Sequence, residues 1–493
     1  MKYISTRNSA LKVTAAEAIA KGLAPDGGLF IPEMIPSVTE DEIRSMLGMT
    51  YQQRAEIVLS KYLTDFSADE IHELVMLSYG DNFDDVAVTP LHFIDENTAC
   101  LELWHGPTCA FKDVALQMLP HLLTMSLKKC GETREVCILV ATSGDTGKAA
   151  LEGFSDVPGT KIIVFYPNDG VSDVQKMQMI TQSGNNVLVY AVDGNFDDAQ
   201  TGVKKIFNDK KFEEVLTGRG KFLSSANSIN WGRLLPQIVY YFNAYCDYVN
   251  AGHISWGDSL DYAVPTGNFG DILAGWYAKN MGLPAGKLIC CSNSNNVLTD
   301  FLSTGNYDKN RKFFTTISPS MDILVSSNLE RLLYSLSKSD EKVAGYMEEL
   351  FSKGQYQVTD DMIQSIKADF DAGYCDDSDT KTTIRKVMDK NDYLIDTHTA
   401  VAYKVLENYR ETHAVVPTVV LSTASPFKFC DSVLSAMGED VQLSGAELIN
   451  RLSEKTGRSI PKPLDGIDKR QVRFNETTSK EKMIDVVDHF LKA

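Results

Sequence analysis

From about residue 91 onward, short apolar runs alternate with stretches that have helical spacing. Several of the apolar runs are continuous, as in strands that are buried on both faces of a parallel sheet. Strands are therefore expected at residues 137–141, 162–166, 187–192, 262–264, 288–291 and 418–422. Helices are expected between them, around residues 149–154, 199–208, 234–245 and 272–281. This order predicts an α/β fold with a largely parallel sheet.

The two ends of the chain show a different pattern. Helical spacing at residues 15–22, 40–47 and 51–63 predicts a mostly helical segment up to about residue 85, interrupted by the turn sequence Pro-Asp-Gly-Gly at residues 25–28. Residues 356–390 are expected to form helix and polar loop. An apolar stripe predicts a final amphipathic helix over residues 480–491.

Composition restricts the possible partners. The chain has 493 residues and a net charge of −18, from 48 Lys and Arg against 66 Asp and Glu. A field of this sign disfavours binding to nucleic acid or to an anionic membrane surface. No apolar run approaches the roughly 20 residues that span a bilayer.

The cysteines and the first residues of the chain indicate the cellular compartment in which the protein is expected. The nine cysteines include no Cys-x-x-Cys pair, and no apolar segment follows the first residues. A reduced, cytoplasmic protein is expected. The acidic residues Asp81, Asp84 and Asp85 are most simply a solvated loop, so no metal site is predicted.

Three expected strands run into loops of small residues. These loops are Ser143-Gly144-Asp145-Thr146-Gly147, Gly267-Asn268-Phe269-Gly270-Asp271 and Ser422-Thr423-Ala424-Ser425. A helix that begins at such a loop offers free backbone N–H groups to a phosphate or a carboxylate. None of the three is a P-loop or a G-x-G-x-x-G turn, and any one alone could equally be a plain strand-to-helix connection. Two glycine-bearing loops together suggest two anionic groups, one on a cofactor and one on a substrate.

A single lysine is the candidate nucleophile. Lys112 follows a Gly-Pro turn at residues 106–107 and falls in the first turn of an expected helix that begins near Ala110. A cation at a helix N-terminus is disfavoured, and a lysine that loses its proton easily can form a Schiff base. Spacing alone favours the other interpretation, which is a solvated surface lysine.

Taken together, these segments resemble a known family over nearly the whole chain. The resemblance is to the threonine synthases, pyridoxal-phosphate enzymes of the tryptophan-synthase-like fold (fold type II), and to their longer bacterial and fungal branch. The matching segments are Ser5-Thr6-Arg7, residues 22–30, 105–113, 143–147, 225–233, 265–271, 318–323 and 396–400, and Ser422-Thr423-Ala424.

The resemblance implies a role for each matching residue. Lys112 matches the lysine that forms the Schiff base with pyridoxal 5'-phosphate and acts as acid and base. The residues that match cofactor-binding positions are Lys112, Gly267, Asn268, Phe269, Gly270, Asp271 and Thr423. Those that match substrate-binding positions are Ser143, Gly144, Asp145, Thr146, Gly147, Asn227 and Arg233, with Arg233 assigned to the substrate phosphate. Ser425 stands where the family commonly has histidine, so any role of that histidine is in doubt here.

The implied activity is the conversion of O-phospho-L-homoserine and water to L-threonine and phosphate, the last step of threonine biosynthesis. The implied architecture is a helical N-terminal segment (residues 1–88), a first α/β domain with Lys112 and the Ser-Gly-Asp-Thr-Gly loop (89–225), and a second α/β domain with the phosphate loop and the C-terminal helix (226–493). The chain is expected to weave between these domains, with the site in the crevice and closure of the crevice during catalysis. A monomer is expected, with a dimer as the alternative.

Two other functions fit parts of the pattern. One is a serine or threonine dehydratase of the same fold, which would release ammonia from its substrate. The other is a noncatalytic α/β protein that binds a nucleotide or another small anion. It would show no cofactor absorbance and no covalent adduct after borohydride reduction.

Overall fold

Two largely parallel sheets organise the computed structural model, which describes residues 1–168, 171–440 and 442–492. The first has five strands in the order β16-β8-β7-β6-β9, all parallel. The second has six strands in the order β14-β11-β10-β15-β5-β4, parallel except for β4. The strands of the first sheet are β6 (Glu135–Ala141), β7 (Thr160–Pro167), β8 (Val187–Val192), β9 (Lys221–Ser224) and β16 (Thr477–Thr478). Those of the second are β4 (Leu91–Asp95), β5 (Thr98–Glu102), β10 (Leu260–Pro265), β11 (Ala285–Ser292), β14 (Phe370–Tyr374) and β15 (Thr418–Ser422).

All six strands expected from the apolar runs are present, and each sheet is covered on both faces. In β6, Val136, Ile138 and Val140 belong to the main core, while Cys137 and Leu139 pack against the helices on the other face. This double burial explains why the runs are continuous. The helices around the first sheet are α6 (Leu119–Lys129), α7 (Asp145–Phe154), α8 (Asp173–Ile180), α9 (Phe196–Asn208), α10 (Lys210–Gly218) and α21 (Met483–Lys492).

The helices associated with the second sheet fall into two groups. The large core contains α11 (Trp231–Asn250), α12 (Gly270–Met281), α13 (Val297–Thr304), α14 (Leu329–Ser337), α15 (Asp340–Ser352) and α16 (Asp360–Asp369). The opposite face carries α17 (Asp377–Asn391), α18 (Thr397–Arg410), α19 (Cys430–Ala436) and α20 (Ala446–Thr456). Short elements complete the chain: α5 (Lys112–Leu116), the hairpin of β12 (Asn306–Asp308) with β13 (Gln355–Gln357), and the 3-10 turns η1 (Pro319–Met321), η2 (Pro426–Lys428) and η3 (Ile467–Lys469).

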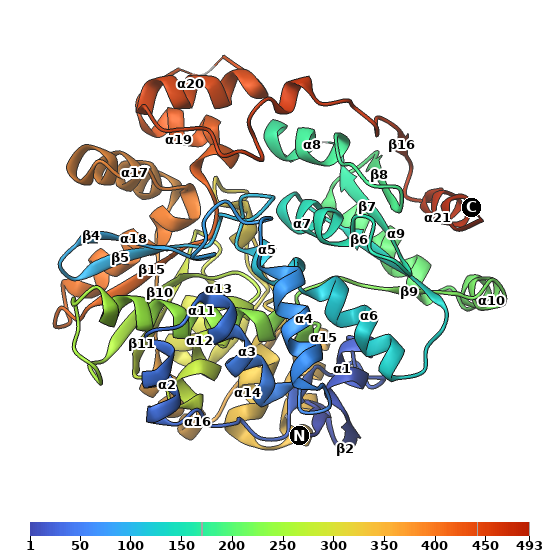
Figure 1. Ribbon diagram of the computed structural model, residues 1–493, viewed down its shortest axis with the longest axis horizontal. Helices are drawn as coiled ribbons and strands as arrows, with labels where there is room; N and C mark the ends of the chain where they lie inside the picture. Colours follow the sequence, from blue (N-terminus) through green and yellow to red (C-terminus); the bar gives the residue numbers. More distant parts are fainter. Residues whose placement is uncertain (169–170, 441, 493) are drawn as a thin grey trace.

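The chain passes between the two sheets more than once, so the ranges 89–225 and 226–493 do not each correspond to one sheet. Strand β5 pairs with β15 in parallel, which places residues 91–102 in the six-stranded sheet. After α20 the chain crosses back, and β16 extends the five-stranded sheet beside β8. Figure 1 shows this C-terminal segment running across the top of the molecule to α21. Strand pairing between distant segments decides these borders, and the spacing of apolar residues carries no information about it.

The N-terminal segment contains the expected helices and also a small sheet that the spacing missed. Four helices, each opened by a capping box, are α1 (Ala15–Lys21), α2 (Glu40–Met46), α3 (Tyr51–Tyr62) and α4 (Ala68–Ser78). In the small sheet, β1 (Tyr3–Ser5) and β2 (Asn8–Val13) precede α1, β3 (Phe30–Pro32) follows it, and β1 pairs antiparallel with both of the other strands. Two of these strands have only three residues, too few to show an alternating pattern.

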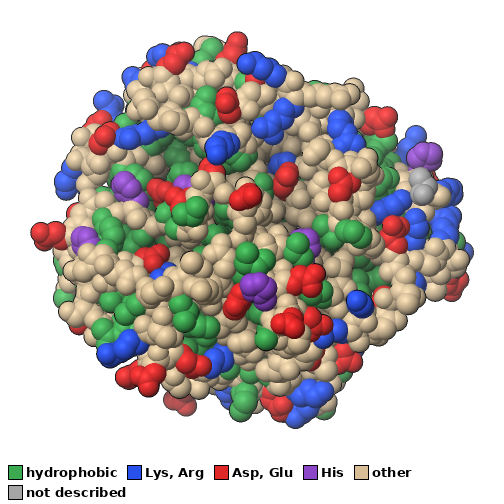
Figure 2. All heavy atoms as spheres, viewed as in Figure 1, with side chains coloured by type: hydrophobic (Ala, Val, Ile, Leu, Met, Phe, Trp, Pro, Cys, Tyr) green, Lys and Arg blue, Asp and Glu red, His purple; other side chains and the backbone are tan. Residues whose placement is uncertain are grey.

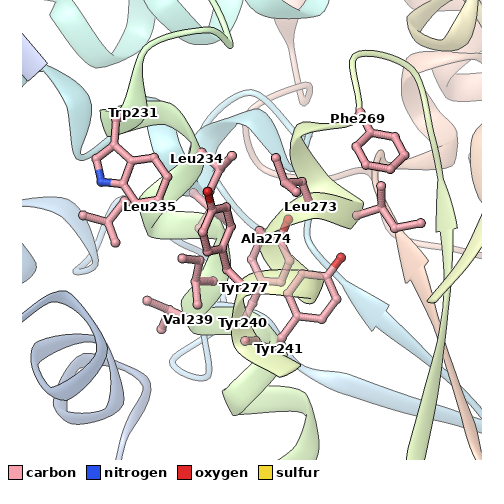
Figure 3. Close-up of a cluster of buried hydrophobic side chains, with 14 of the residues drawn as sticks. Trp231, Leu234, Leu235, Val239, Tyr240, Tyr241, Phe269, Leu273, Ala274 and Tyr277 are labelled. Carbon is pink, nitrogen blue, oxygen red and sulfur yellow. The ribbon is translucent and has the colours of Figure 1, made fainter. Parts of the chain in front are cut away.

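An aromatic cluster joins this segment to the rest of the protein. The Trp231 ring on α11 lies 5.6 Å from Tyr3, 5.5 Å from Tyr62 and 5.3 Å from Tyr277, measured between ring centroids. Figure 3 shows the side chains of α11 and α12 interleaved around Tyr277. Helix α11 is buried along most of its length, including its polar residues Arg233, Gln237 and Asn243.

Residues 356–390 also differ from the expected helix and polar loop. Strand β14 lies within this range and forms an edge of the six-stranded sheet, with Leu288 opposite Phe370. Its central residues Asp371, Ala372 and Gly373 are poor strand formers, and an edge position beside β11 outweighs that preference.

Acidic and basic side chains are interspersed over the face shown in Figure 2, rather than gathered into one field. Within residues 1–168, 171–440 and 442–492, no helix combines the length and the apolar character needed to cross a membrane.

Candidate active site

A cavity of about 1660 Å³ lies among the N-terminal segment and the carboxyl ends of strands from both sheets. It brings together most of the residues singled out in the sequence. Those that line it are Lys112, Ser143, Asp145, Thr146, Asn227, Arg233, Gly267, Asn268, Phe269, Gly270, Asp271 and Thr423. Gly144 and Gly147 are not among the lining residues.

Lys112 opens the five-residue helix α5 and points its amine into this cavity. Its Nζ lies 3.4 Å from Asp145 Oδ2 and 3.4 Å from Ser320 Oγ, and it lies over the Phe111 ring. Burial lowers the pKa of Lys112; Asp145 opposes this, while the positive charges of Lys428 and Arg233 add to it. The helix N-terminus was expected to lower the pKa of Lys112, but burial is the larger cause of the lowering.

Two contacts fix the backbone around Lys112. The Asp113 carboxylate accepts hydrogen bonds from the Thr108 N–H at 2.8 Å and the Thr108 hydroxyl at 2.6 Å, which closes the Gly-Pro turn. The Phe111 N–H donates to the Thr423 carbonyl at 2.8 Å, and Ala110 forms a bridge with Ala424. The lysine and the end of β15 are therefore held as one unit.

Asp145 is buried and surrounded by donors. Its Oδ1 contacts Lys428 Nζ at 2.9 Å and accepts a hydrogen bond from Gln175 Nε2 at 2.8 Å, while Oδ2 faces Lys112. Burial alone would raise the pKa of Asp145, but the charges of Lys428 and Lys112 outweigh it and hold the pKa well below its usual range. Asp145 is therefore a carboxylate at neutral pH.

Gly144 and Gly147 fix the conformation of the Ser143–Gly147 loop, although neither lines the cavity. The Thr142 hydroxyl accepts hydrogen bonds from the N–H groups of Gly144 and Gly147, at 3.0 and 2.9 Å. A Cβ on Gly147 would collide with the Thr142 side chain, and Gly144 has a φ of +147°. The lining residues Ser143, Asp145 and Thr146 remain to face a ligand at the N-terminus of α7.

The second loop lines the cavity with all of residues 267–270. The Gly267 carbonyl accepts from Ser326 Oγ at 2.9 Å, and the Asn268 carbonyl accepts from the N–H and the side chain of Asn328, both at 3.1 Å. A Cβ on Gly267 would lie 2.6 Å from the Ser320 carbonyl oxygen. The carbonyls of Gly267 and Asn268 are therefore held by Ser326 and Asn328. The N–H groups of residues 267–270 lie at the N-terminus of α12, where the helix dipole favours an anion.

Asp271 lies just inside that helix. Its Oδ1 accepts hydrogen bonds from Tyr240 OH at 2.5 Å and from Tyr241 OH at 3.0 Å, and its buried Oδ2 has no hydrogen-bond partner in the described part of the chain. Burial raises the pKa of Asp271 to about 6, although the two tyrosines and Lys112 act in the opposite direction.

Arg233 is a cation without a carboxylate beside it among the described residues. The residue is 4% exposed, its Nη1 donates to the Ala226 carbonyl at 2.5 Å, and its Nε has no partner there. Burial lowers the pKa of Arg233 to about 10, so the guanidinium remains charged. A buried guanidinium with open donors that lines a cavity is suited to an anionic ligand.

The two histidines inside the matched segments differ in position. His398 lines the cavity, where its Nε2 accepts from the Ser320 N–H at 3.2 Å and its Nδ1 lies 2.7 Å from Asp396 Oδ2. His105 is not a lining residue and lies between Asp84 and Glu102, at 2.6 and 2.8 Å. Ser425 is fully buried, caps η2 and is likewise not a lining residue.

Sequence reasoning did not single out three residues that the structure places here. Ser320 and Gln237 line the cavity, and Lys428 lies behind Asp145. Ser320 belongs to residues 318–323, a segment that matches the family, so the sequence could have indicated it as a site residue. Nothing in the sequence distinguishes Lys428 or Gln237 from ordinary surface residues.

The residues present fit a cofactor that carries both a phosphate and an aldehyde. The N-terminus of α12 at residues 267–270 and the Arg233 guanidinium offer places for anions, and Lys112 offers an amine of lowered pKa in the same cavity.

Comparison with known proteins agrees with this fit. The family model described as "Pyridoxal-phosphate dependent enzyme" matches residues 84–424, so the fold and the site define an enzyme of that class. The models "Threonine synthase N terminus" and "Threonine synthase, C-terminal" match residues 2–79 and 399–487. The chain belongs to the threonine synthase family.

Individual relatives support the same assignment. The human protein "Threonine synthase-like 1" is 42% identical over 88% of this chain, and the chain spans 60% of that protein's length. "Threonine synthase" of Pseudomonas aeruginosa is 41% identical, over 88% of this chain and 90% of its own. The crystal structure of pyridoxal-phosphate-bound threonine synthase from Brucella melitensis superposes with a TM-score of 0.89 at 38% identity and covers all of both chains.

Proposed function

We propose that this protein is a threonine synthase that uses pyridoxal 5'-phosphate. The substrate is O-phospho-L-homoserine, and the enzyme is a carbon–oxygen lyase that acts on phosphate. In the net reaction the bond between Cγ and the phosphate oxygen breaks and inorganic phosphate leaves. Cβ loses one proton and gains the hydroxyl of water, and Cγ gains one proton and becomes the methyl group of L-threonine.

One observation carries the proposal. The largely buried Lys112 amine lies 3.4 Å from the buried Asp145 carboxylate, and its cavity is also lined by residues 267–270 at the N-terminus of α12 and by Arg233. Two anion-binding places around one amine suit a phosphorylated cofactor and a phosphorylated amino acid. A dehydratase substrate such as serine has no phosphate to occupy the second place.

The residues that hold the cofactor are Lys112, Gly267, Asn268, Phe269, Gly270 and Thr423, and Asp271 borders them. When bound, pyridoxal phosphate supplies an electron-accepting π system that stabilises negative charge at the carbon next to the substrate nitrogen. The amides of residues 267–270 would hold the cofactor phosphate, and Thr423, which lines the same cavity, would offer its hydroxyl to the pyridine nitrogen.

Lys112 moves the protons at the substrate carbons. An amine of lowered pKa accepts a proton at neutral pH, and burial keeps competing water away from it. The Asp145 carboxylate, at 3.4 Å, orients the amine and stabilises the ammonium form after the transfer.

Two further groups orient the substrate. Ser143 and Thr146, at the N-terminus of α7, bind its carboxylate. Arg233 and Asn227 bind the phosphate that is to leave, and the guanidinium compensates the charge that develops on the departing oxygen.

The test is incubation of the purified protein with O-phospho-L-homoserine while L-threonine and phosphate are measured together. Equal yields are expected. Phosphate without threonine, or ammonia release from serine or threonine, would instead assign the protein to the dehydratases. Protein without a cofactor absorbance band, and without an adduct after borohydride reduction, would contradict both.

The proposal extends to location and assembly. We place the protein in the cytoplasm as a monomer. All nine cysteines are free thiols and eight of them are buried, as suits a reducing compartment. Fractionation of cells and light scattering on the purified protein test these two statements, and a dimer in solution would contradict the second.

A further inference from the structure

A second lysine, fully buried, lies directly behind the reactive one. Lys428 ends the turn η2 and has no exposed surface. Its Nζ contacts Asp145 Oδ1 at 2.9 Å and donates to the Thr108 carbonyl at 2.8 Å and to Gln178 Oε1 at 3.1 Å. Three segments therefore meet at one ammonium group: the lysine loop, the Ser143–Gly147 loop and helix α8.

These contacts form a continuous row of charges. Lys428 holds one oxygen of Asp145, and the other oxygen faces Lys112 at 3.4 Å. A charge this deeply buried is costly unless partners compensate for it, and the carboxylate here compensates two cations at once. Asp145 is therefore only partly available to Lys112. Its carboxylate stabilises the ammonium form of Lys112 less than it would if it paired with Lys112 alone.

We propose that Lys428 is a positioning residue that shares Asp145 with Lys112 and thereby keeps Lys112 in the neutral, nucleophilic form. The inference deepens the proposed function, because it assigns the group that prepares the base for that reaction. It assigns Lys428 no contact with substrate or cofactor.

The other charged groups nearby do not replace this effect. Arg233 repels the Lys112 ammonium ion in the same sense as Lys428, and Asp271 attracts it. Asp113 and Cys109 face Lys428, and Asp113 already accepts two hydrogen bonds from Thr108. Of these groups, only Asp145 lies within 4 Å of both lysine amines.

The experiment measures the reactivity of Lys112 directly. The full chain, freed of cofactor, is trace-labelled with acetic anhydride over a range of pH, and the Lys112 peptide is quantified by mass spectrometry. In Lys428→Met, Asp145 pairs with Lys112 alone, so the pH of half-maximal labelling should rise by about one unit or more. In Lys428→Arg, which keeps the charge, it should stay within a few tenths of a unit of the wild-type value.

Two further variants separate electrostatics from folding. Lys148→Met removes another buried lysine, which pairs with Glu152 on α7 at 2.7 Å and not with Asp145. It should lower thermal stability and leave the labelling pH of Lys112 unchanged. In the double variant Lys428→Met with Asp145→Asn, the labelling pH should fall below that of Lys428→Met, because the carboxylate that holds the proton on Lys112 is gone.

If Lys428→Met loses stability as Lys148→Met does, with no change in the labelling pH of Lys112, the role of Lys428 is structural and the proposal is wrong. The readout needs no turnover. A shifted labelling pH in a protein that makes no threonine from O-phospho-L-homoserine would support the inference and contradict the proposed function.

Discussion

The Phe111 N–H donates a hydrogen bond of 2.8 Å to the carbonyl oxygen of Thr423. This bond joins the residue before the reactive lysine to the end of β15, from which the Thr423 side chain faces the same cavity. The two groups proposed to contact opposite parts of the cofactor are therefore held at a fixed separation by the backbone and not by flexible side chains.

Replacing the reactive lysine should remove cofactor binding without unfolding the protein. Lys112→Ala is expected to abolish both the visible absorbance of the bound cofactor and the formation of threonine, while far-UV circular dichroism stays the same. Lys204→Ala is the matched control, since Lys204 is an exposed lysine that lines the mouth of the same cavity. If Lys112→Ala kept the absorbance, the assignment of Lys112 would be wrong.

Removing the unpaired guanidinium should reduce substrate binding and preserve stability. Arg233→Met is expected to raise KM for O-phospho-L-homoserine about 10- to 100-fold, the value of one charge-assisted hydrogen bond to phosphate. Thermal stability should be unchanged or higher, because a desolvated cation with one carbonyl partner is lost.

The control for Arg233 is Arg331, which is also fully buried but donates to the Phe30 and Ile229 carbonyls and to Asn328. Arg331→Met should therefore destabilise the fold by more than about 2 kcal/mol in denaturant unfolding. Equal loss of stability in the two variants would show that Arg233 is structural.

A methyl group at Gly267 should disturb the phosphate loop. In Gly267→Ala, the added Cβ would lie 2.6 Å from the Ser320 carbonyl, so either η1 or the loop must move. Cofactor affinity, measured by absorbance titration, is expected to fall at least tenfold. Gly218→Ala is the control, since Gly218 does not line the cavity and its Cβ would meet no atom within 4 Å. Comparable affinity in both variants would contradict the steric argument.

Stability should depend on pH through His105. Although burial opposes it, hydrogen bonds to Asp84 and Glu102 raise the pKa of His105 to about 9, above the unfolded value of about 6.5. Protonated His105 therefore stabilises the folded state. The stabilisation is complete below about pH 6.5 and is lost as the pH rises through 9.

Urea unfolding of His105→Gln should accordingly show a deficit of at most about 3 kcal/mol at pH 6 that disappears near pH 9.5. The control is His72→Gln, because His72 is exposed and its pair with Glu56 contributes little. A deficit that is the same at both pH values would show that the imidazolium charge of His105 is not what stabilises the fold.

The sequence alone determined most strands of the two large sheets and predicted the loops that are proposed to carry the chemistry. Continuous apolar runs identified β6, β7, β8, β10, β11 and β15, because strands covered on both faces need no polar side. Glycine-bearing loops at strand ends predicted two anion-binding places, and residues of both loops line one cavity, because parallel strands end at the same edge of a sheet. The small sheet at the N-terminus and strand β14 were missed, since short or edge strands have no such pattern.

Only the tertiary structure decided which residues act on one another. Lys428 lies 320 positions from Thr108 in the sequence and still donates to its carbonyl. A lowered pKa of Lys112 was predicted from its place at a helix N-terminus, but burial among distant segments is the larger cause of the lowering. Desolvation and the sharing of Asp145 between two lysines depend on what surrounds each charge in three dimensions, and residue order does not specify that.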